Sequence, residues 1–150
     1  MFRGISAVNL DTKGRMVVPT RYRDVLEKDA ASKLVITIDT EEPCLLLYPL
    51  FEWEVIEKKI EALPSFNKAA RRIQRLLMGH ATELELDGNS RVLLPPILRE
   101  YAQLDKKIML VGQGKKFEIW SESEWNNKRN GWLVDENEGE LPAELESLSL

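Results

Sequence analysis

Two aspartate–arginine pairs in the sequence share one spacing: Asp11 with Arg15, and Asp87 with Arg91. The residues between the partners are typical of tight turns, and Gly14 can take the positive φ that such a turn requires. An aspartate at the base of a turn can accept hydrogen bonds from turn N–H groups, or it can hold the arginine in one orientation. A guanidinium group held in this way can bind guanine O6 and N7, or a phosphate group, through two hydrogen bonds.

The pairs also have a simpler interpretation, in which each is an exposed hairpin salt bridge of little energetic importance. In a nucleic-acid interface, Lys13 at the tip of the first turn would add a phosphate contact. The second turn has Asn89 and Ser90 at the positions of Lys13 and Gly14, so it is less basic, and whether it contacts DNA stays open. Arg3 lies near the start of the first expected strand, either beside these turns or at a solvated terminus.

The elements that must position these turns form an internal repeat, in which residue 10 aligns with residue 86. Residues 10–24 read LDTKGRMVVPTRYRD, and residues 86–100 read LDGNSRVLLPPILRE. The identical pairs are Leu10/Leu86, Asp11/Asp87, Arg15/Arg91, Pro19/Pro95 and Arg23/Arg99. Because these residues punctuate turns and strand ends, the repeat indicates a shared geometry. We expect each copy to run strand, turn, strand, short helix, strand, turn, strand, helix, and the copies to pack around a pseudo-twofold axis.

This pattern divides the chain into four regions: a first repeat in residues 1–62, a connecting helix in 63–80, a second repeat in 81–132 and an acidic C-terminal tail in 133–150. The expected strands are 5–10, 15–18, 34–38, 45–48, 108–111 and 117–120. Helical spacing predicts inward faces after an N-cap at Thr20 (Tyr22, Val25, Leu26) and after Pro95-Pro96 (Ile97, Leu98, Tyr101, Ala102). Two more faces are predicted between the repeats, with Gly79 as the stop: Trp53, Ile56, Ile60, Leu63, and then Phe66, Ala69, Ala70, Ile73, Leu76, Leu77.

The net charge of −4 hides an uneven distribution. Residues 133–150 hold six acidic and no basic residues, whereas residues 1–28 carry a local charge of +3 and residues 65–80 one of +4. The asymmetry indicates a basic working surface and an acidic tail that could compete with DNA for it. The bases of the last segment are Lys68, Arg71, Arg72 and Arg75. We interpret this stripe as a solvated helix face, with a secondary phosphate contact or a subunit salt bridge as alternatives.

No catalytic constellation is visible, and we expect neither an enzyme nor a metal site. The only cysteine, Cys44, is interpreted as a small core residue. The only histidine, His80, is far from it in sequence and is expected at a helix end. No apolar run is long enough to cross a bilayer and residues 1–4 lack a signal-peptide stretch, so we expect a cytoplasmic protein. Core or interface anchors, not base-stacking platforms, are expected at Trp53, Trp120, Trp125 and Trp132.

Together these residues closely resemble the MraZ family. The likeness rests on the opening Phe2-Arg3-Gly4, on residues 10–15 (LDTKGR) followed by Pro19, and on the second D-x-x-x-R pair at residues 87–91. It covers residues 2 to about 132. Each half resembles the AbrB-type swapped-hairpin DNA-binding fold. The resemblance therefore implies an α+β, β-rich fold, in which two AbrB-like repeats form a pseudo-twofold, double-psi-like barrel with peripheral helices.

The same resemblance implies a bacterial transcriptional regulator that acts at the promoter of the division and cell-wall gene cluster, including its own gene. It implies ring-shaped homo-oligomers on repeated boxes of double-stranded DNA, a place at the nucleoid, and no cofactor, membrane partner or small-molecule substrate. The expected DNA-binding residues are Arg15, Lys13, Arg3, Asp11, Gly14, Arg91 and Asp87. The alternative function is an oligomeric protein-interaction module without specific DNA binding.

Overall fold

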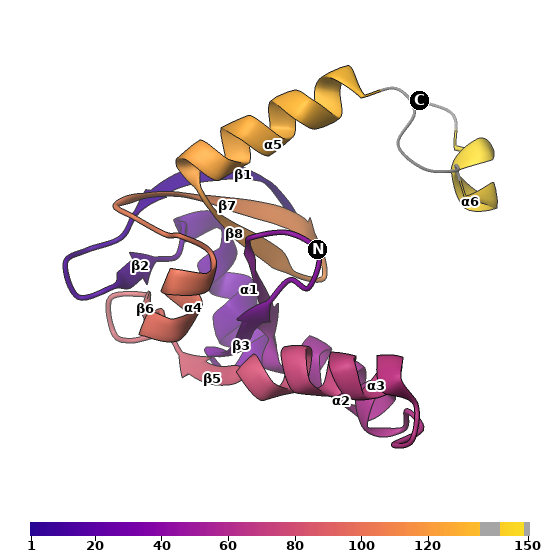
Figure 1. Cartoon of the computed structure of the whole chain (residues 1–150). Coiled ribbons are helices and arrows are strands. Elements are labelled where there is room, and N and C mark those ends of the chain that lie inside the picture. The colour runs from indigo at the N-terminus through magenta and orange to yellow at the C-terminus, as the bar shows by residue number, and fades with distance from the viewer. Residues whose placement is uncertain (136–141, 149–150) are drawn as a thin grey trace.

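The computed structural model describes residues 1–135 and 142–148, and it contains one large and one small antiparallel sheet (Figure 1). The large sheet has six strands in the order β1-β7-β8-β4-β3-β5, and the small sheet pairs β2 with β6. The strands are β1 (Phe2–Asn9), β2 (Arg15–Val17), β3 (Lys33–Ile38), β4 (Leu45–Pro49), β5 (Thr82–Glu85), β6 (Arg91–Leu93), β7 (Lys107–Gly114) and β8 (Phe117–Ser121). The helices are α1 (Thr20–Ala30), α2 (Leu50–Glu61), α3 (Lys68–Ile73), the π-helical η1 (Gln74–Met78), α4 (Pro96–Tyr101), α5 (Glu122–Val134) and α6 (Ala143–Glu146).

The first strand of each repeat pairs with the other repeat. Strand β1 lies against β7, and β5 lies against β3, so each half of the large sheet contains a strand from both repeats. Equivalent residues of the two repeats lie opposite each other at the centre of two strand pairs. These are Leu46 and Glu118 in β4–β8, and Met16 and Val92 in β2–β6, so a pseudo-twofold axis relates the repeats. The expected pseudo-twofold packing and the mixed, strand-rich α+β class are therefore confirmed. The barrel is not confirmed, because the large sheet is open and has β1 and β5 at its edges.

Both expected second hairpins are present. Strand β3 pairs with β4, and β7 pairs with β8. Strands β3, β4 and β8 are buried along nearly their whole length, because both faces of the sheet are covered there. In the first repeat, β1 and β2 do not form the expected hairpin. They meet at an isolated bridge between Leu10 and Met16 and then diverge. A swapped arrangement explains this, since the strand that pairs with β1 is β7 of the other repeat.

Prolines end the short strands and begin the helices that follow. Pro19 and Pro95 have nearly the same backbone angles, φ −55° and ψ 142° against φ −58° and ψ 141°, and each is the N-cap residue of its helix. The expected N-cap at Thr20 is wrong, because Thr20 is already the first helical residue and no side chain caps α1. The fixed φ of proline sets the chain direction here, so a hydroxyl cap is not needed.

The main core lies between one face of the large sheet and a layer made of β2, β6, α1 and α4. Residues of the two repeats are buried there at equivalent positions: Leu10/Leu86, Met16/Val92, Val18/Leu94, Tyr22/Leu98 and Leu26/Ala102. Helices α2 and η1 cover part of the opposite face, where Tyr48 packs on Trp53. Helix α5 covers another part, over β7 and β8, where Trp120 packs on Trp125. The tryptophans at these two places are core anchors, as expected.

Several predicted helical faces were too wide. Val25, Ile97 and Tyr101 are exposed at 38%, 65% and 37%, because α1 and α4 each turn only a narrow stripe toward the core. Phe66 is fully exposed because it precedes α3, where helical spacing does not apply. Leu63 is likewise exposed beyond the end of α2.

The structure also bears on the expected helix stop at Gly79 and on the acidic tail. Gly79 is the C-cap residue of η1, close to the expected stop, but it keeps a right-handed conformation (φ −62°, ψ −32°) in place of the left-handed one typical of a glycine stop. The predicted acidic tail begins inside α5, and its residues 136–141 and 149–150 lie outside the described part of the chain. Within the described ranges, no helix is both long and apolar enough to span a bilayer.

Because the two repeats share one sheet and one core, we expect the chain to unfold in a single transition. Leu98→Ala, at a fully buried position, should lower the free energy of unfolding by about 2–5 kcal/mol without splitting that transition. Urea unfolding at fixed protein concentration, followed by tryptophan fluorescence and by circular dichroism, measures this. The exposed neighbour variant Ile97→Ala is the control and should change stability little. Different midpoints for the two probes would contradict a shared core.

Candidate functional site

The two arginines of the repeated motif lie on one face of the β2–β6 ribbon. Met16 and Val92 face each other across the ribbon and are almost completely buried, so they form its inner face. Their neighbours in sequence point the opposite way, because successive side chains of a strand alternate. Arg15 and Arg91 therefore share the outer face, diagonally across the pseudo-twofold axis, with their Cα atoms about 8 Å apart by strand geometry.

The first loop is closed by the Asp11 carboxylate. Its Oδ1 atom accepts hydrogen bonds from the backbone N–H groups of Lys13 and Arg15, both at 2.9 Å. Its Oδ2 atom accepts from Nε of Arg15 at 2.7 Å. Gly14 takes a positive φ of 85° and donates its N–H to the carbonyl of Asp11. The carboxylate thus fills both expected roles, because it closes the turn and also orients the guanidinium group.

The second loop repeats this geometry, although it has Asn89 and Ser90 where the first loop has Lys13 and Gly14. Asp87 accepts from the backbone N–H groups of Asn89 at 2.8 Å and Arg91 at 2.9 Å, and from Nε of Arg91 at 2.9 Å. Ser90 stands where the first loop has glycine and still adopts a positive φ of 57°. Both loops therefore present an arginine in the same way, and they differ mainly in the lysine at the first tip. Figure 1 shows the two loops side by side at one end of the molecule.

Both arginines keep one edge for an outside partner. Each ion pair uses Nε, and the arginine side chains are still exposed at 30% and 28%. Among the described residues, no hydrogen bond of Arg15 or Arg91 involves Nη1 or Nη2. Those two nitrogens supply parallel N–H donors, which suits a planar acceptor pair such as a guanine edge or two phosphate oxygens.

The turn N–H groups also keep the carboxylates ionised. The hydrogen bond from the backbone N–H of Arg15, ahead of the one from its side chain, lowers the pKa of Asp11 to about 2. The backbone N–H of Arg91 lowers the pKa of Asp87 in the same way. Each aspartate therefore stays ionised further into acid than an ordinary aspartate, and the arginine beside it keeps a fixed counter-ion.

Each loop is supported by the other repeat. Leu94 donates its N–H to the carbonyl of Gly14, and Val18 donates its N–H to the carbonyl of Ser90. Arg99, held by a hydrogen bond from Nε to the carbonyl of Leu94 at 2.9 Å, lies directly against Gly14. A Cβ atom at Gly14 would come within 2.5 Å of the Arg99 guanidinium carbon, so a larger residue would displace that side chain, and the positive φ of 85° itself favours glycine.

Arg23 is the equivalent residue in the first repeat, and its Nε donates to the carbonyl of Val18 at 2.9 Å. Arg23 and Arg99 are an identical pair of the internal repeat, but the sequence alone assigns them no role. Their common position four residues after a repeated proline was the available signal. The contact of Arg99 with the opposite loop could not be derived, because it depends on how the repeats pack.

The remaining predicted site residues lie at different distances from the ribbon. Lys13 is exposed at the tip of the first loop, as expected. Arg3 is exposed near the opposite end of β1, about 20 Å from Asn9 by strand length, and its carbonyl accepts a hydrogen bond from the hydroxyl of Tyr22. The structure does not bring Arg3 beside the loops, and its role in binding stays a prediction.

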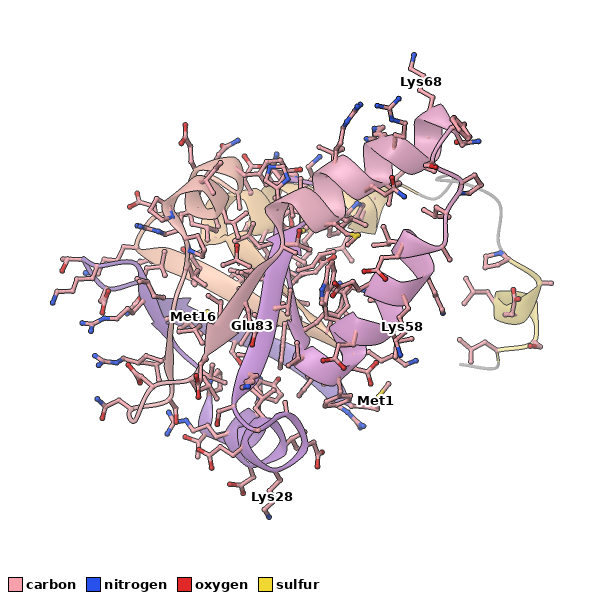
Figure 2. The ribbon with its side chains drawn as sticks, turned by 90° about the horizontal axis from the view of Figure 1, so that it is seen from below. Met1, Met16, Lys28, Lys58, Lys68 and Glu83 are labelled. Atoms are coloured by element: carbon pink, nitrogen blue, oxygen red, sulfur yellow. The ribbon has the colours of Figure 1, made fainter. Side chains whose placement is uncertain are left out.

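The basic stripe between the repeats is a separate surface. Lys68, Arg72 and Arg75 line a surface hollow with Ala69 and Leu76. In Figure 2, Lys68 lies at the tip of a projecting helix, well away from Met16 and the ribbon. The stripe is thus not part of the two-loop site within one chain.

The polar group around Cys44 has no feature of a catalytic centre. Its thiol is buried beside the carboxylates of Asp39 and Glu118, and burial raises its pKa well above the ordinary range. A thiol that stays protonated is a poor nucleophile. His80 lies near a helix end, as expected, with Nδ1 at 2.7 Å from the carbonyl oxygen of Leu76.

The fold and the site define a class of protein in which two strand-exchanging, β-rich repeats present oriented arginines on a two-stranded ribbon. Comparison with known proteins then identifies the family. The family described as "MraZ protein, putative antitoxin-like" matches residues 1–76 and 77–129, so the chain belongs to the MraZ family.

The chain is similar over its full length to curated members of this family. It is 57% identical over 152 residues to the "Transcriptional regulator MraZ" of Coxiella burnetii (strain RSA 493 / Nine Mile phase I). It is 55% identical over 153 residues to the protein of the same name from Legionella pneumophila (strain Paris), and 53% identical over 152 residues to that of Halorhodospira halophila (strain DSM 244 / SL1). In each case the match covers 100% of both chains.

The lowered pKa of Asp11 predicts how the first loop responds to acid. Because the folded pKa of about 2 lies below the ordinary value of 3.8, the carboxylate stabilises the loop fully above about pH 4 and loses this effect as the pH falls through 2. An NMR titration of the side-chain carboxyl carbon should give a midpoint near 2. In Arg15→Ala the midpoint should rise only part of the way, because the backbone N–H of residue 15 remains. The midpoint of Asp87 should not move, and an ordinary midpoint for wild-type Asp11 would contradict the loop geometry.

The packing of Arg99 on Gly14 predicts an effect across the repeats. Arg99→Ala should speed hydrogen exchange of the Gly14 and Arg15 amides about fivefold, for a loss of local stability of about 1 kcal/mol. The matched control is Arg129→Ala, which removes an exposed arginine of α5 and should leave these amides unchanged. If Arg99→Ala perturbs only amides of the second repeat, the support across repeats does not exist.

Proposed function

We propose that the chain is a sequence-specific DNA-binding transcriptional regulator that inserts its β2–β6 ribbon into the major groove. The observation that carries the proposal is the pair of oriented guanidinium groups on the outer face of one ribbon, Arg15 and Arg91. A two-stranded ribbon fits the width of the major groove, where base edges are fully distinguishable. The relatives that match over the whole chain are named transcriptional regulators, which supports this class of function.

The loop residues divide into readers and supports. Arg15 and Arg91 would contact guanine edges or phosphates through their Nη groups, and Lys13 would contact a phosphate from the tip of the first loop. Asp11 and Asp87 would hold the arginines in their binding orientation, which lowers the side-chain entropy lost on binding. Gly14 would allow the first turn and the close approach of Arg99. Both loops would act on one stretch of duplex, because they sit on one ribbon.

We further propose that several subunits act together. One ribbon offers few contacts, so a single subunit would bind DNA weakly, whereas a homo-oligomeric ring on repeated boxes would multiply the contacts through avidity. We place these boxes in the promoter of the division and cell-wall gene cluster, the chain's own gene included, as the resemblance of the sequence to the MraZ family implies. Such a regulator would work at the nucleoid and would need no cofactor.

Removing Arg15 tests the proposal. Arg15→Ala should weaken binding to the duplex upstream of the gene by about 5- to 150-fold per engaged subunit, the range expected for one bidentate base contact. Arg15→Lys should restore charge without restoring full affinity, because an ammonium group cannot form the paired contact. Fluorescence anisotropy at two salt concentrations measures both effects, and the wild-type complex should weaken steeply with salt. Arg129→Ala serves as the charge-matched control.

Circular dichroism and solution mass should stay unchanged in Arg15→Ala, because the side chain is partly exposed and outside the core. Equal binding by the wild type and this variant would refute the assigned role of the ribbon. A wild type that lacks any duplex preference, yet retains a protein partner from nuclease-treated extract, would favour the protein-interaction alternative.

A further inference from the structure

The outer face of the ribbon carries two apolar side chains between its arginines. Val17 lies directly opposite Arg91, and Leu93 lies directly opposite Arg15. Val17 is 40% exposed and Leu93 is 55% exposed, while the inner-face residues next to them are buried. The face therefore consists of two cross-strand pairs, each with one arginine and one aliphatic residue, related by the pseudo-twofold axis.

The core does not require either aliphatic residue. The apolar surface that the ribbon gives to the core comes from Met16 and Val92, which are 0% and 1% exposed. A strand with one solvated face ordinarily places polar residues there. Single exposed apolar residues are common on proteins, but these two lie within a cross-strand neighbour distance of about 5 Å from a guanidinium-bearing residue. Each therefore lies beside an arginine of the site, exposed and outside the core.

We infer that Val17 and Leu93 are specificity-determining residues that contact the C5-methyl groups of thymines beside the guanines bound by the arginines. This inference rests on the proposed function and names the bases that it would read. In the major groove the thymine methyl is the apolar feature of a base pair, and aliphatic side chains recognise it by contact. Successive base pairs are about 3.4 Å apart along the duplex, so an arginine and its aliphatic neighbour would reach neighbouring base steps.

The two pairs are related in position but not in size. Leucine reaches further from its strand than valine, and the first loop also carries the additional charge of Lys13. The chain would therefore read a guanine–thymine feature twice, with unequal strength. A duplex that offers both features within the span of one ribbon would bind best.

Replacement of thymine by deoxyuridine removes only the methyl group and so isolates this contact. The test uses the full-length protein and the duplex upstream of its gene, with each thymine of the bound region replaced singly. For the wild type, at least one replacement should lower affinity about fourfold, the value expected for one buried methyl-sized group. For Val17→Ala or Leu93→Ala, the replacement opposite the missing side chain should have no further effect, so the two changes should not be additive.

Two further variants keep the test decisive. Val17→Thr replaces one of the two methyl groups by a hydroxyl group and keeps the β-branched shape that a strand favours. It should reduce the response to deoxyuridine without abolishing it, because one methyl group remains, and it covers the case in which Val17→Ala folds poorly. Val25→Ala removes a similarly exposed valine from α1, and its response to every replacement should match that of the wild type.

The outcomes separate the two levels of inference. If wild-type protein binds no duplex specifically, the proposed function fails. If binding is specific and depends on Arg15, but no thymine responds or Val17→Ala and Leu93→Ala respond like the wild type, the reading of methyl groups is overturned and the DNA-binding function stands. A change in solution mass for both Val17→Thr and Leu93→Ala would also overturn it, because it would place these side chains in a subunit junction.

Discussion

The exchange of first strands between the repeats is the constraint on which the rest of the structure depends. With β1 on β7 and β5 on β3, neither repeat has a complete sheet of its own, and the two share one core. The exchange also brings the chain segments that follow β1 and β5 to the same end of the molecule, where β2 and β6 pair. The ribbon is thus a product of the shared sheet, and its two loops inherit a fixed spacing from it.

At that end of the molecule, local hydrogen bonds set the shape of each loop, and packing between the repeats sets the position of one loop relative to the other. Each aspartate closes its own turn and orients its own arginine, which requires only a few neighbouring residues. The placement of one loop beside the other requires the opposite repeat, through the backbone hydrogen bonds from Val18 and Leu94 and the packing of Arg99. The loop backbones are held in place by hydrogen bonds, and the outer side chains of the loops are polar. A site that recognises a ligand of fixed shape should be built in this way.

The sequence predicted the features that local chemistry controls. The turn spacing, the two second hairpins and the burial of equivalent residues in both copies follow from residue type and periodicity. The same evidence misjudged Thr20, because Pro19 takes the N-cap position of α1. It also predicted inward faces of α1 and α4 that were too wide, since they included Val25 and Ile97. The open sheet and the contact of Arg99 with Gly14 depend on residues far apart in the chain, and periodicity carries no information on such partners.

The pseudo-twofold axis lies within a single polypeptide, and this has a consequence for how the ribbon persists when the protein is scarce. A ribbon assembled from two separate chains would come apart on dilution, at the dissociation constant of that dimer. Here the halves are covalently joined, so each molecule keeps its complete pair of loops at any concentration. Because one chain carries both repeats, each repeat can also change in sequence independently of the other. Leu46 lies opposite Glu118, and the first loop has Lys13 at the position that Asn89 holds in the second. The ribbon would therefore be intact even in a cell that contains only a few copies of the protein.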